Sequence, residues 1–222
     1  MRGDKELGIN VVLFGAGGKI GRVIADELLL RHHQVTGVTR GGDFATPHGS
    51  AITVKAGDVT NPDVVADLIA GHDAVASAVG PQIGVEDDET ILLGAARSLT
   101  AALPRANVRR LVVLGGAGGL EVAPGVRVVD TPSFPAMWKA NALAQIKALA
   151  LYRDVEHLDW TVVSPAAIIE PGERTGTFRI GGDQLLVDAE GSSRISIADY
   201  AIAFVNELER GEAIRRRITV AY

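Results

Sequence analysis

A glycine-rich turn, Gly15-Ala-Gly-Gly18-Lys-Ile-Gly21, constrains the fold more than any other segment of the sequence. An apolar run over residues 9–14 precedes the turn, and apolar residues at helical spacing follow it as far as Arg31. A strand, a glycine turn and a helix in this order are typical of a dinucleotide-binding unit. The alternative is a glycine-rich turn that binds no ligand, and the strand and helix around it favour binding.

Each position of this turn has a physical role. Gly15 permits the tight turn, Gly18 lets the backbone approach a diphosphate, and Gly21 lets helix and strand pack closely. The start of the helix adds unpaired backbone N–H groups and partial positive charge. We therefore predict that Gly15, Gly18, Lys19, Ile20 and Gly21 hold a diphosphate, although the Lys19 side chain is equally compatible with simple exposure to solvent.

Strands and helices are expected to alternate along the rest of the chain. The predicted strands are 34–39, 51–55, 73–79, 108–114, 160–164 and 217–222, and the predicted helices are 61–71, 87–103, 136–153 and 196–210. Pro104 is expected to end the second of these helices, and Ser196 with Asp199 to form a capping box at the start of the last. The alternation predicts an α/β fold, a Rossmann-type doubly wound parallel sheet with helices on both faces.

Composition supports one soluble globular domain over residues 1–222, with a small substrate-side region at 165–195. The chain is 47% hydrophobic and 22% charged, which suffices for one sizeable core. Its 22 Lys and Arg against 27 Asp and Glu give a net charge of -5, and no stretch gathers five or six like charges. Binding to nucleic acid is therefore not expected.

Metal, disulfide and membrane chemistry are not expected either. The chain has no cysteine, and its five histidines lack the spacing of metal ligands. The adjacent His32 and His33 are interpreted as a solvated helix end. Neither a signal peptide nor a run of about 18 apolar residues is evident, so the cytoplasm is the expected location. The oligomeric state is not predicted.

The end of the second strand indicates which nicotinamide cofactor is preferred. NAD-binding proteins carry an acidic residue there for the ribose 2′-hydroxyl, and this chain has Arg40 instead. A guanidinium can form paired hydrogen bonds to a 2′-phosphate. We therefore predict that NADP(H) is preferred over NAD(H), while the nearby Asp43 keeps NAD as an alternative and a solvated Arg40 remains possible.

Two further turns are candidate cofactor contacts. After the third strand, Asp58 and Val59 are expected to meet the adenine, although Asp58 also suits a simple turn before the next helix. After the fourth strand, Ala78, Val79 and Gly80 bring small residues to the carboxyl end of the sheet, where such folds bind ligands. The alternative for these three residues is an ordinary strand end.

These residues resemble a known family, the NAD(P)H-binding and NADH-flavin-reductase-like branch of the atypical short-chain dehydrogenases/reductases, with relatives among NmrA-like proteins. The resemblance covers nearly the whole chain. Its motifs are the glycine turn in the form Gly-x-x-Gly-x-x-Gly and the segments 57–59, 115–118, 122–125, 164–168, 170–174, 181–188, 193–196 and 199–201. It implies a Rossmann-type sheet, bound NADP(H), and redox chemistry on a substrate held under the C-terminal region.

The catalytic residues usual in that superfamily are missing here. A Tyr-x-x-x-Lys pair would need a tyrosine four residues before a lysine, but Pro135 precedes Lys139 and Leu143 precedes Lys147. The expected serine is replaced by glycine at 115 and 116. Lys139 remains the one catalytic candidate, as a ligand of the nicotinamide ribose, with Trp138 beside it as a wall of the substrate pocket or a plain buried aromatic.

The resemblance also places the backbone of Ser164 and Pro165 at the nicotinamide carboxamide. The Ser164 hydroxyl is a candidate proton donor, although a structural cap is the more ordinary role for it. The predicted function is hydride transfer from NADPH to a flavin-like or quinone-like acceptor, a chemistry that tolerates a missing proton donor. A non-catalytic NADP(H)-binding redox sensor is the alternative. A nucleotide-sugar epimerase or dehydratase is weaker, because that chemistry depends on the tyrosine.

Overall fold

The computed structural model describes residues 8–44, 52–80 and 88–222. Its elements are β1 (Asn10–Phe14), α1 (Lys19–Leu30), β2 (Gln34–Thr39), β3 (Ile52–Ala56), α2 (Pro62–Ile69), β4 (Ala74–Ser77), α3 (Asp88–Arg105), β5 (Arg110–Leu114), η2 (Ala117–Gly119), β6 (Glu121–Ala123), β7 (Val126–Arg127), η3 (Val128–Asp130), α4 (Ala136–Arg153), β8 (Asp159–Pro165), β9 (Ile168–Glu170), β10 (Arg179–Gly181), β11 (Arg194–Ser196), α5 (Ile197–Arg210) and β12 (Arg216–Ala221). The predicted element starts at Ala51 and Asp87 lie outside the described residues.

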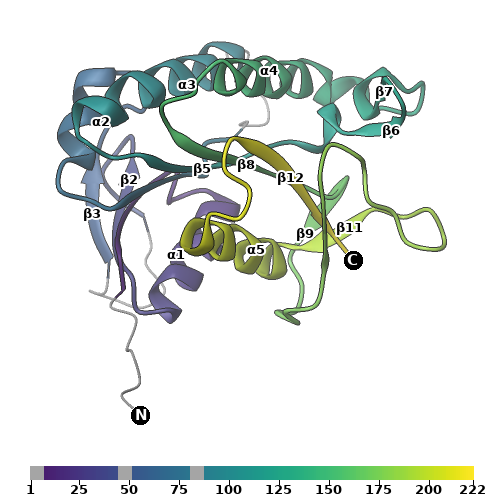
Figure 1. Cartoon of the computed structure of the whole chain (residues 1–222). Helices are drawn as coiled ribbons and strands as arrows, with labels where there is room; N and C mark the ends of the chain where they lie inside the picture. The colour runs from purple at the N-terminus through teal and green to yellow at the C-terminus, as the bar shows by residue number, and fades with distance from the viewer. Residues whose placement is uncertain (1–7, 45–51, 81–87) are drawn as a thin grey trace.

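The described strands form an eight-stranded central sheet in the order β10-β12-β8-β5-β4-β1-β2-β3. Its neighbouring strands are parallel, except that β10 runs antiparallel to β12 at one edge. From β1 the chain moves outward through β2 and β3, and then returns to build the other half from β4 onward (Figure 1). This doubly wound order confirms the predicted Rossmann-type α/β fold.

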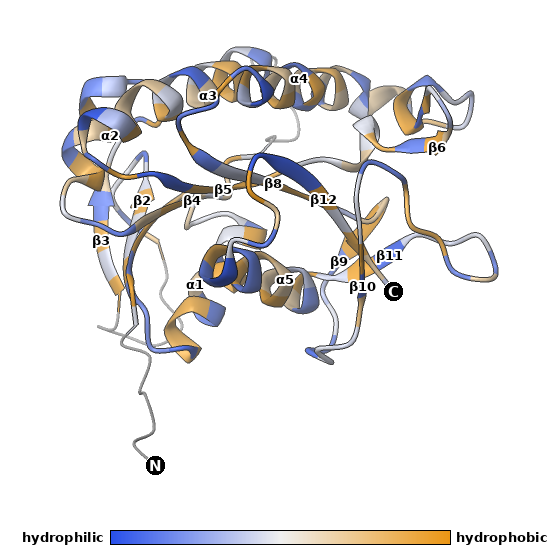
Figure 2. Cartoon of the chain, in the orientation of Figure 1, coloured by the Kyte–Doolittle hydropathy of each residue, from blue (hydrophilic) through white to orange (hydrophobic). Residues whose placement is uncertain are grey.

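Helices cover both faces of this sheet. Figure 1 shows α2, α3 and α4 on one face and α1 with α5 on the other. Each face has its own hydrophobic cluster, with Leu28 and Phe204 in one and Leu99 and Leu149 in the other. In Figure 2, hydrophobic and polar residues alternate around α4 and α5, as expected for helices with one side on a sheet.

The expectation that Pro104 ends its helix is wrong. Helix α3 continues through Pro104 to Arg105, because a proline this close to the end removes only one intrahelical hydrogen bond. The chain turns out of the helix two residues later at Asn107, whose φ of 57° is left-handed. The Val108 amide donates to the Leu103 carbonyl at 3.0 Å, which caps the free carbonyls of the last turn.

Of the two hydrogen bonds expected in the capping box at the start of α5, the structure contains one. The Ser196 hydroxyl accepts a hydrogen bond from the Asp199 amide at 2.9 Å. The carboxylate of Asp199 does not return the bond, because it accepts from the Thr175 hydroxyl at 2.6 Å and from the Tyr222 hydroxyl at 2.8 Å. The buried Asp199 thereby ties the segment after β9 to the C-terminal residue.

The interpretation of His32 and His33 as a solvated helix end is wrong for His33. This side chain is buried at 8% exposure. Its Nδ1 accepts from the Ile9 amide at 3.2 Å, and its Nε2 lies 2.9 Å from a carboxylate oxygen of Glu209. His33 therefore joins the residue before β1 to α5, whereas His32 is exposed with a φ of 66°.

The region 165–195 lies at one edge of the main sheet. Its strand β9 pairs in parallel with β11 in a separate two-stranded sheet. The expected short strands between residues 172 and 191 are represented by β10, which extends the main sheet. No helix within the described ranges is long and apolar enough to span a membrane.

Candidate functional site

The predicted cofactor residues come from separate turns, and the sheet brings these turns to one edge. The register places Phe14 of β1 beside Val38 of β2 and Ser77 of β4, so these parallel strands end together. The residues that close or follow such strands include Gly15, Arg40, Asp58, Ala78 and Ser164. The candidate site is therefore the carboxyl edge of the sheet, centred where the strand order reverses between β1 and β4.

The glycine turn is packed so closely that side chains are excluded at two positions. Gly15 has a φ of 76°, and a Cβ there would lie 2.8 Å from the Ala78 carbonyl carbon. A Cβ on Gly21 would lie 2.1 Å from the Gly15 carbonyl oxygen. Both glycines thus let α1 begin directly against the end of β1, as the sequence predicts.

The start of α1 is open on the side of the turn. Its N-cap residue is Gly18, which has no side chain to cap the first backbone amides. Gly18 and Lys19 are exposed, and Ile20 is half-buried. Arg22 secures the turn by donating from Nε to the Gly17 carbonyl at 2.9 Å. This cradle of backbone N–H groups and positive charge fits a diphosphate.

The two residues predicted for the adenosine side lie near each other. Arg40 is exposed directly after β2. Asp58 accepts hydrogen bonds from the Thr60 amide at 2.9 Å and the Thr60 hydroxyl at 2.7 Å. These bonds, with the nearby charge of Arg40, hold the pKa of the Asp58 carboxyl below its ordinary value despite some desolvation. Arg40 is therefore close enough to act on Asp58 electrostatically.

Asp43, the residue that kept NAD as an alternative, belongs to a local turn. Its amide donates to the Thr39 hydroxyl at 3.2 Å, and its carbonyl accepts from the same hydroxyl at 3.2 Å. On the adjacent turn, Val59 is half-buried against the cluster under α2 and α3. The turns that follow β2 and β3 are thus both held by hydrogen bonds between residues close in sequence.

The end of β4 contacts the glycine turn directly. The Ala78 amide donates to the Phe14 carbonyl at 2.9 Å, which extends the pairing of β1 with β4. Ala78 is buried, whereas Val79 and Gly80 are half-buried. The predicted small residues therefore border the turn, and a larger side chain at Gly80 would approach Leu114 at 3.5 Å.

On the other half of the site, Gly115 replaces the expected serine for a packing reason. A Cβ at Gly115 would lie 2.6 Å from Val162 and 2.8 Å from the Ser164 hydroxyl oxygen. The Ser164 side chain is 1% exposed, and its Oγ has no hydrogen-bond partner in the described part of the chain. Ser164 thus brings an unsatisfied hydroxyl to the carboxyl ends of β5 and β8. Pro165 is the last residue of β8.

Lys139, the catalytic candidate, lies on the first turn of α4 and is exposed. Its charge contributes to the lowered pKa of Asp130, although the hydrogen bond from Arg127 is the main cause. Lys139 is therefore near the η3 turn that precedes α4. The neighbouring Trp138 is half-buried.

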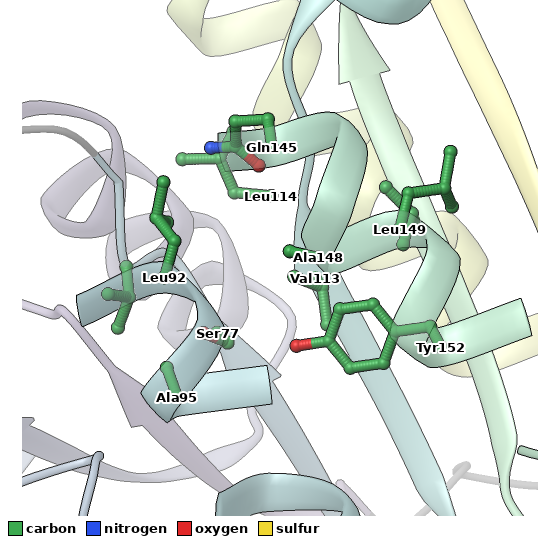
Figure 3. A pocket seen from close by; sticks show the side chains of 11 residues that line it. Ser77, Leu92, Ala95, Val113, Leu114, Gln145, Ala148, Leu149 and Tyr152 are labelled. Carbon is green, nitrogen blue, oxygen red and sulfur yellow. The ribbon is translucent and has the colours of Figure 1, made fainter. Parts of the chain in front are cut away.

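Two polar residues of α4 near the site were missed by the sequence reasoning. Gln145 and Tyr152 line a hollow of about 20 Å³ over β4 and β5, with Gln145 at one end and the Tyr152 ring at the other (Figure 3). Burial raises the pKa of the Tyr152 hydroxyl well above its ordinary value, so this tyrosine is a poor proton donor at neutral pH. No sequence motif marks either residue, because neither belongs to a Tyr-x-x-x-Lys pair.

Among the described residues, no cluster of three or more His, Asp or Glu side chains is arranged to hold a metal ion. Three buried or half-buried charged clusters are centred on Glu27, Glu207 and Asp183, and the third includes Arg217, which borders the carboxyl end of β8. Each is paired with arginine. We therefore interpret these clusters as structural.

The fold and the cradle at α1 define a Rossmann-class dinucleotide-binding protein. Residues 15–208 match the family described as NAD(P)H-binding, and the chain belongs to this family. This confirms the family predicted from the sequence motifs and supports a nicotinamide cofactor.

Three solved structures are similar over almost their full length. One, named "Putative exported protein" from Burkholderia pseudomallei, is 47% identical with a TM-score of 0.87, covering 96% of this chain and 100% of its own. A "putative epimerase" from Bacteroides thetaiotaomicron is 34% identical with a TM-score of 0.89, covering 97% of each chain. A "putative NADH-flavin reductase" from Streptococcus pneumoniae is 33% identical with a TM-score of 0.84, covering 96% and 99%.

Proposed function

We propose that this protein is an NADPH-dependent reductase that passes hydride to a planar acceptor such as a flavin or a quinone. The observation that carries the proposal is the glycine turn at the uncapped start of α1, where a Cβ at Gly15 or Gly21 would collide with backbone. The similarity to a structure named as an NADH-flavin reductase supports the same class of reaction.

The chain's own residues divide the work of binding. The diphosphate is held at the start of α1, the 2′-phosphate by Arg40, and the adenine by Asp58 and Val59. The nicotinamide end is bordered by small residues after β4 and by the backbone at the end of β8, and Lys139 holds its ribose. The full set is Gly15, Gly18, Lys19, Ile20, Gly21, Arg40, Asp58, Val59, Ala78, Val79, Gly80, Lys139, Ser164 and Pro165. When bound, NADPH supplies the hydride.

The acceptor class follows from the missing proton donor. Gly115 and Gly116 carry no hydroxyl, and burial raises the pKa of Tyr152. A ketone needs a proton on its alkoxide as it is reduced, whereas a flavin can take its proton from solvent. A site that positions a planar ring without a general acid therefore suits a flavin or quinone better than a ketone.

The direct test is NADPH oxidation followed with FMN, riboflavin and menadione as acceptors. We expect turnover with at least one of them, and a loss of about tenfold or more in Lys139→Ala, the size of effect that misplacing a reactant produces. The matched control is Lys147→Ala, because Lys147 is on the same helix and pairs with Glu89 at 2.6 Å on the surface. If Lys139→Ala and Lys147→Ala oxidise NADPH at the same rate, Lys139 does not hold the nicotinamide ribose.

The cofactor preference has its own test. Arg40→Ala is expected to weaken NADPH binding about tenfold or more and to leave NADH binding nearly unchanged, because only NADPH carries the 2′-phosphate. Fluorescence titration of both nucleotides measures the two dissociation constants. An unchanged NADPH preference would show that Arg40 is not the 2′-phosphate ligand.

A redox sensor is the second candidate, favoured by the same lack of a proton donor. Tight NADPH binding with no oxidation by any acceptor would support it. The epimerase alternative is weaker because its chemistry relies on a tyrosine acid that this site lacks. The cytoplasmic location stays a prediction.

A further inference from the structure

Two small hollows lie between the sheet and α4, and Gln145 lines both. The first is the hollow of Figure 3. The second has a volume of about 10 Å³ and lies at the carboxyl ends of β5 and β8, bordered by Gly116 and Ser164. A cavity of this size holds about one water-sized group. The second hollow therefore suits a single polar atom of a ligand rather than a ring.

The side chain of Gln145 is available to such an atom. Gly116 lets it lie against the end of β5, because a Cβ on Gly116 would be 3.3 Å from the Gln145 Cγ. Gln145 is half-buried, and its carboxamide has no hydrogen bond to another described residue. A carboxamide offers two N–H donors and one acceptor oxygen. The Gln145 carboxamide is thus held at the hollow without a hydrogen-bond partner among the described residues.

The Ser164 hydroxyl is the second such group. It lines the same hollow, is fully buried and has no partner in the described residues. Buried hydroxyls are normally hydrogen-bonded, and leaving one unpaired costs free energy. Two unpaired polar groups from separate elements, a helix and a strand, therefore border one small hollow at the edge where the cofactor's reactive end is proposed to lie.

The charge around the hollow decides what it accepts. Arg217 also borders it, but Arg217 Nε donates to Asp183 at 2.7 Å and Nη1 donates to the Gly119 carbonyl at 2.9 Å. Its charge is therefore already compensated, and the groups left for a ligand are neutral. Burying an anion without a countercharge is costly, so a neutral oxygen is favoured over a carboxylate or phosphate.

We propose that the second hollow receives one ring carbonyl oxygen of the planar acceptor, which accepts hydrogen bonds from the Ser164 hydroxyl and the Gln145 carboxamide. The inference rests on the proposed reductase function, because it assigns the acceptor's place in that site. Flavins and quinones both carry neutral ring carbonyls, so the hollow could recognise the carbonyl oxygen of either class of acceptor.

The test uses variants that remove one polar group at nearly constant volume, Ser164→Ala and Gln145→Met. The matched control is Thr219→Val. Thr219 is the register partner of Ser164 on β12, and its hydroxyl is likewise buried and unpaired, but it does not line the hollow. Dissociation constants are measured by calorimetry on the full chain saturated with NADP+. The ligands are lumiflavin and menadione, which carry ring carbonyls, and phenazine, which has three fused rings and none.

Each of the two variants is expected to raise the dissociation constant of lumiflavin, menadione or both by about three- to tenfold, the loss typical of one hydrogen bond. Phenazine binding and the Thr219→Val variant should show no change. Because the removed Ser164 hydroxyl has no partner among the described residues, Ser164→Ala should keep the melting temperature of the native chain. A response to lumiflavin alone would identify a flavin, and a response to menadione alone a quinone.

The subsite is overturned if the variants bind lumiflavin and menadione like the native chain, if the native chain binds neither, or if phenazine loses the same affinity. It is also overturned if the loss appears in the NADPH dissociation constant, since the hollow would then hold the cofactor's carboxamide. Carbonyl-dependent binding without NADPH oxidation would leave the subsite standing and remove the reductase proposal. If the native chain oxidises NADPH and neither variant changes the rate, the subsite proposal falls and the reductase proposal stands.

Discussion

Gly18→Asp is expected to weaken NADPH binding about a hundredfold and to leave the protein as stable as the native chain. Gly18 is the N-cap of α1, with φ −72° and ψ 165°, a conformation that aspartate adopts readily. Aspartate is among the best N-cap residues, and this gain offsets the tight contact that a Cβ would make with the Gly15 carbonyl oxygen at 3.3 Å, so the free energy of unfolding should stay nearly unchanged. A large loss of affinity without a loss of stability distinguishes ligand repulsion from misfolding.

The loss of affinity has an electrostatic cause. The new carboxylate would stand where the proposed diphosphate meets the helix, and two like charges about 4 Å apart repel by about 4 kcal/mol at an effective dielectric constant of 20. Solvent and the exposed Lys19 reduce this, so about 3 kcal/mol, or a hundredfold, is expected. Fluorescence titration with NADPH gives the affinity, and thermal unfolding gives the stability.

The control for this experiment is Gly18→Asn, which has nearly the same shape, caps the helix equally well and carries no charge. It should bind NADPH more tightly than the aspartate variant but more weakly than the native chain, because its side chain still hinders the close backbone approach that Gly18 allows. If both variants bind NADPH like the native chain, no phosphate lies at the start of α1. The proposed function would then lose the observation that carries it.

Glu207→Leu is expected to destabilise the protein by about 3–5 kcal/mol without changing NADPH binding. Glu207 is buried on α5 and accepts hydrogen bonds from Arg110 at 2.9 Å, from Thr161 at 3.0 Å and from the Ala213 amide at 3.0 Å. Its removal leaves a largely buried guanidinium without its ion-pair partner, and the Asp159 charge beside it has a weaker influence. Burial already lowers the pKa of Arg110, an effect that Glu207 opposes.

Thermal and denaturant unfolding measure this loss, which corresponds to a fall of roughly 6–20 °C in Tm for a chain of this size. Asp63→Ala is the matched control, because the Asp63 and Arg105 side chains are 77% and 53% exposed and a surface pair contributes about 0–1 kcal/mol. Adding Arg110→Met to Glu207→Leu should restore most of the stability. A single variant with native Tm would mean that the pair is not a structural anchor.

The parts of the site that could be predicted are those whose geometry is set by neighbouring residues. The turn at Gly15 needs a positive φ, and the helix after it needs a small residue at Gly21, so the glycine pattern was visible in the sequence. The same local reasoning failed at Pro104, where the stop signal is the left-handed Asn107 that follows. Local rules therefore located elements better than they located element ends.

By itself, the sequence determined the order of the main helices and of the parallel strands of the central sheet, the Rossmann-type fold, the cradle of glycines and the absence of the Tyr-x-x-x-Lys pair. Those features depend on residue spacing over one turn or one element. Only the tertiary structure placed Gln145 and Ser164 on one hollow, buried His33, and paired Arg110 with Glu207, 97 residues away. Such contacts depend on how whole elements pack across the sheet. Because the residues in contact are far apart in the chain, no periodic pattern in the sequence marks them.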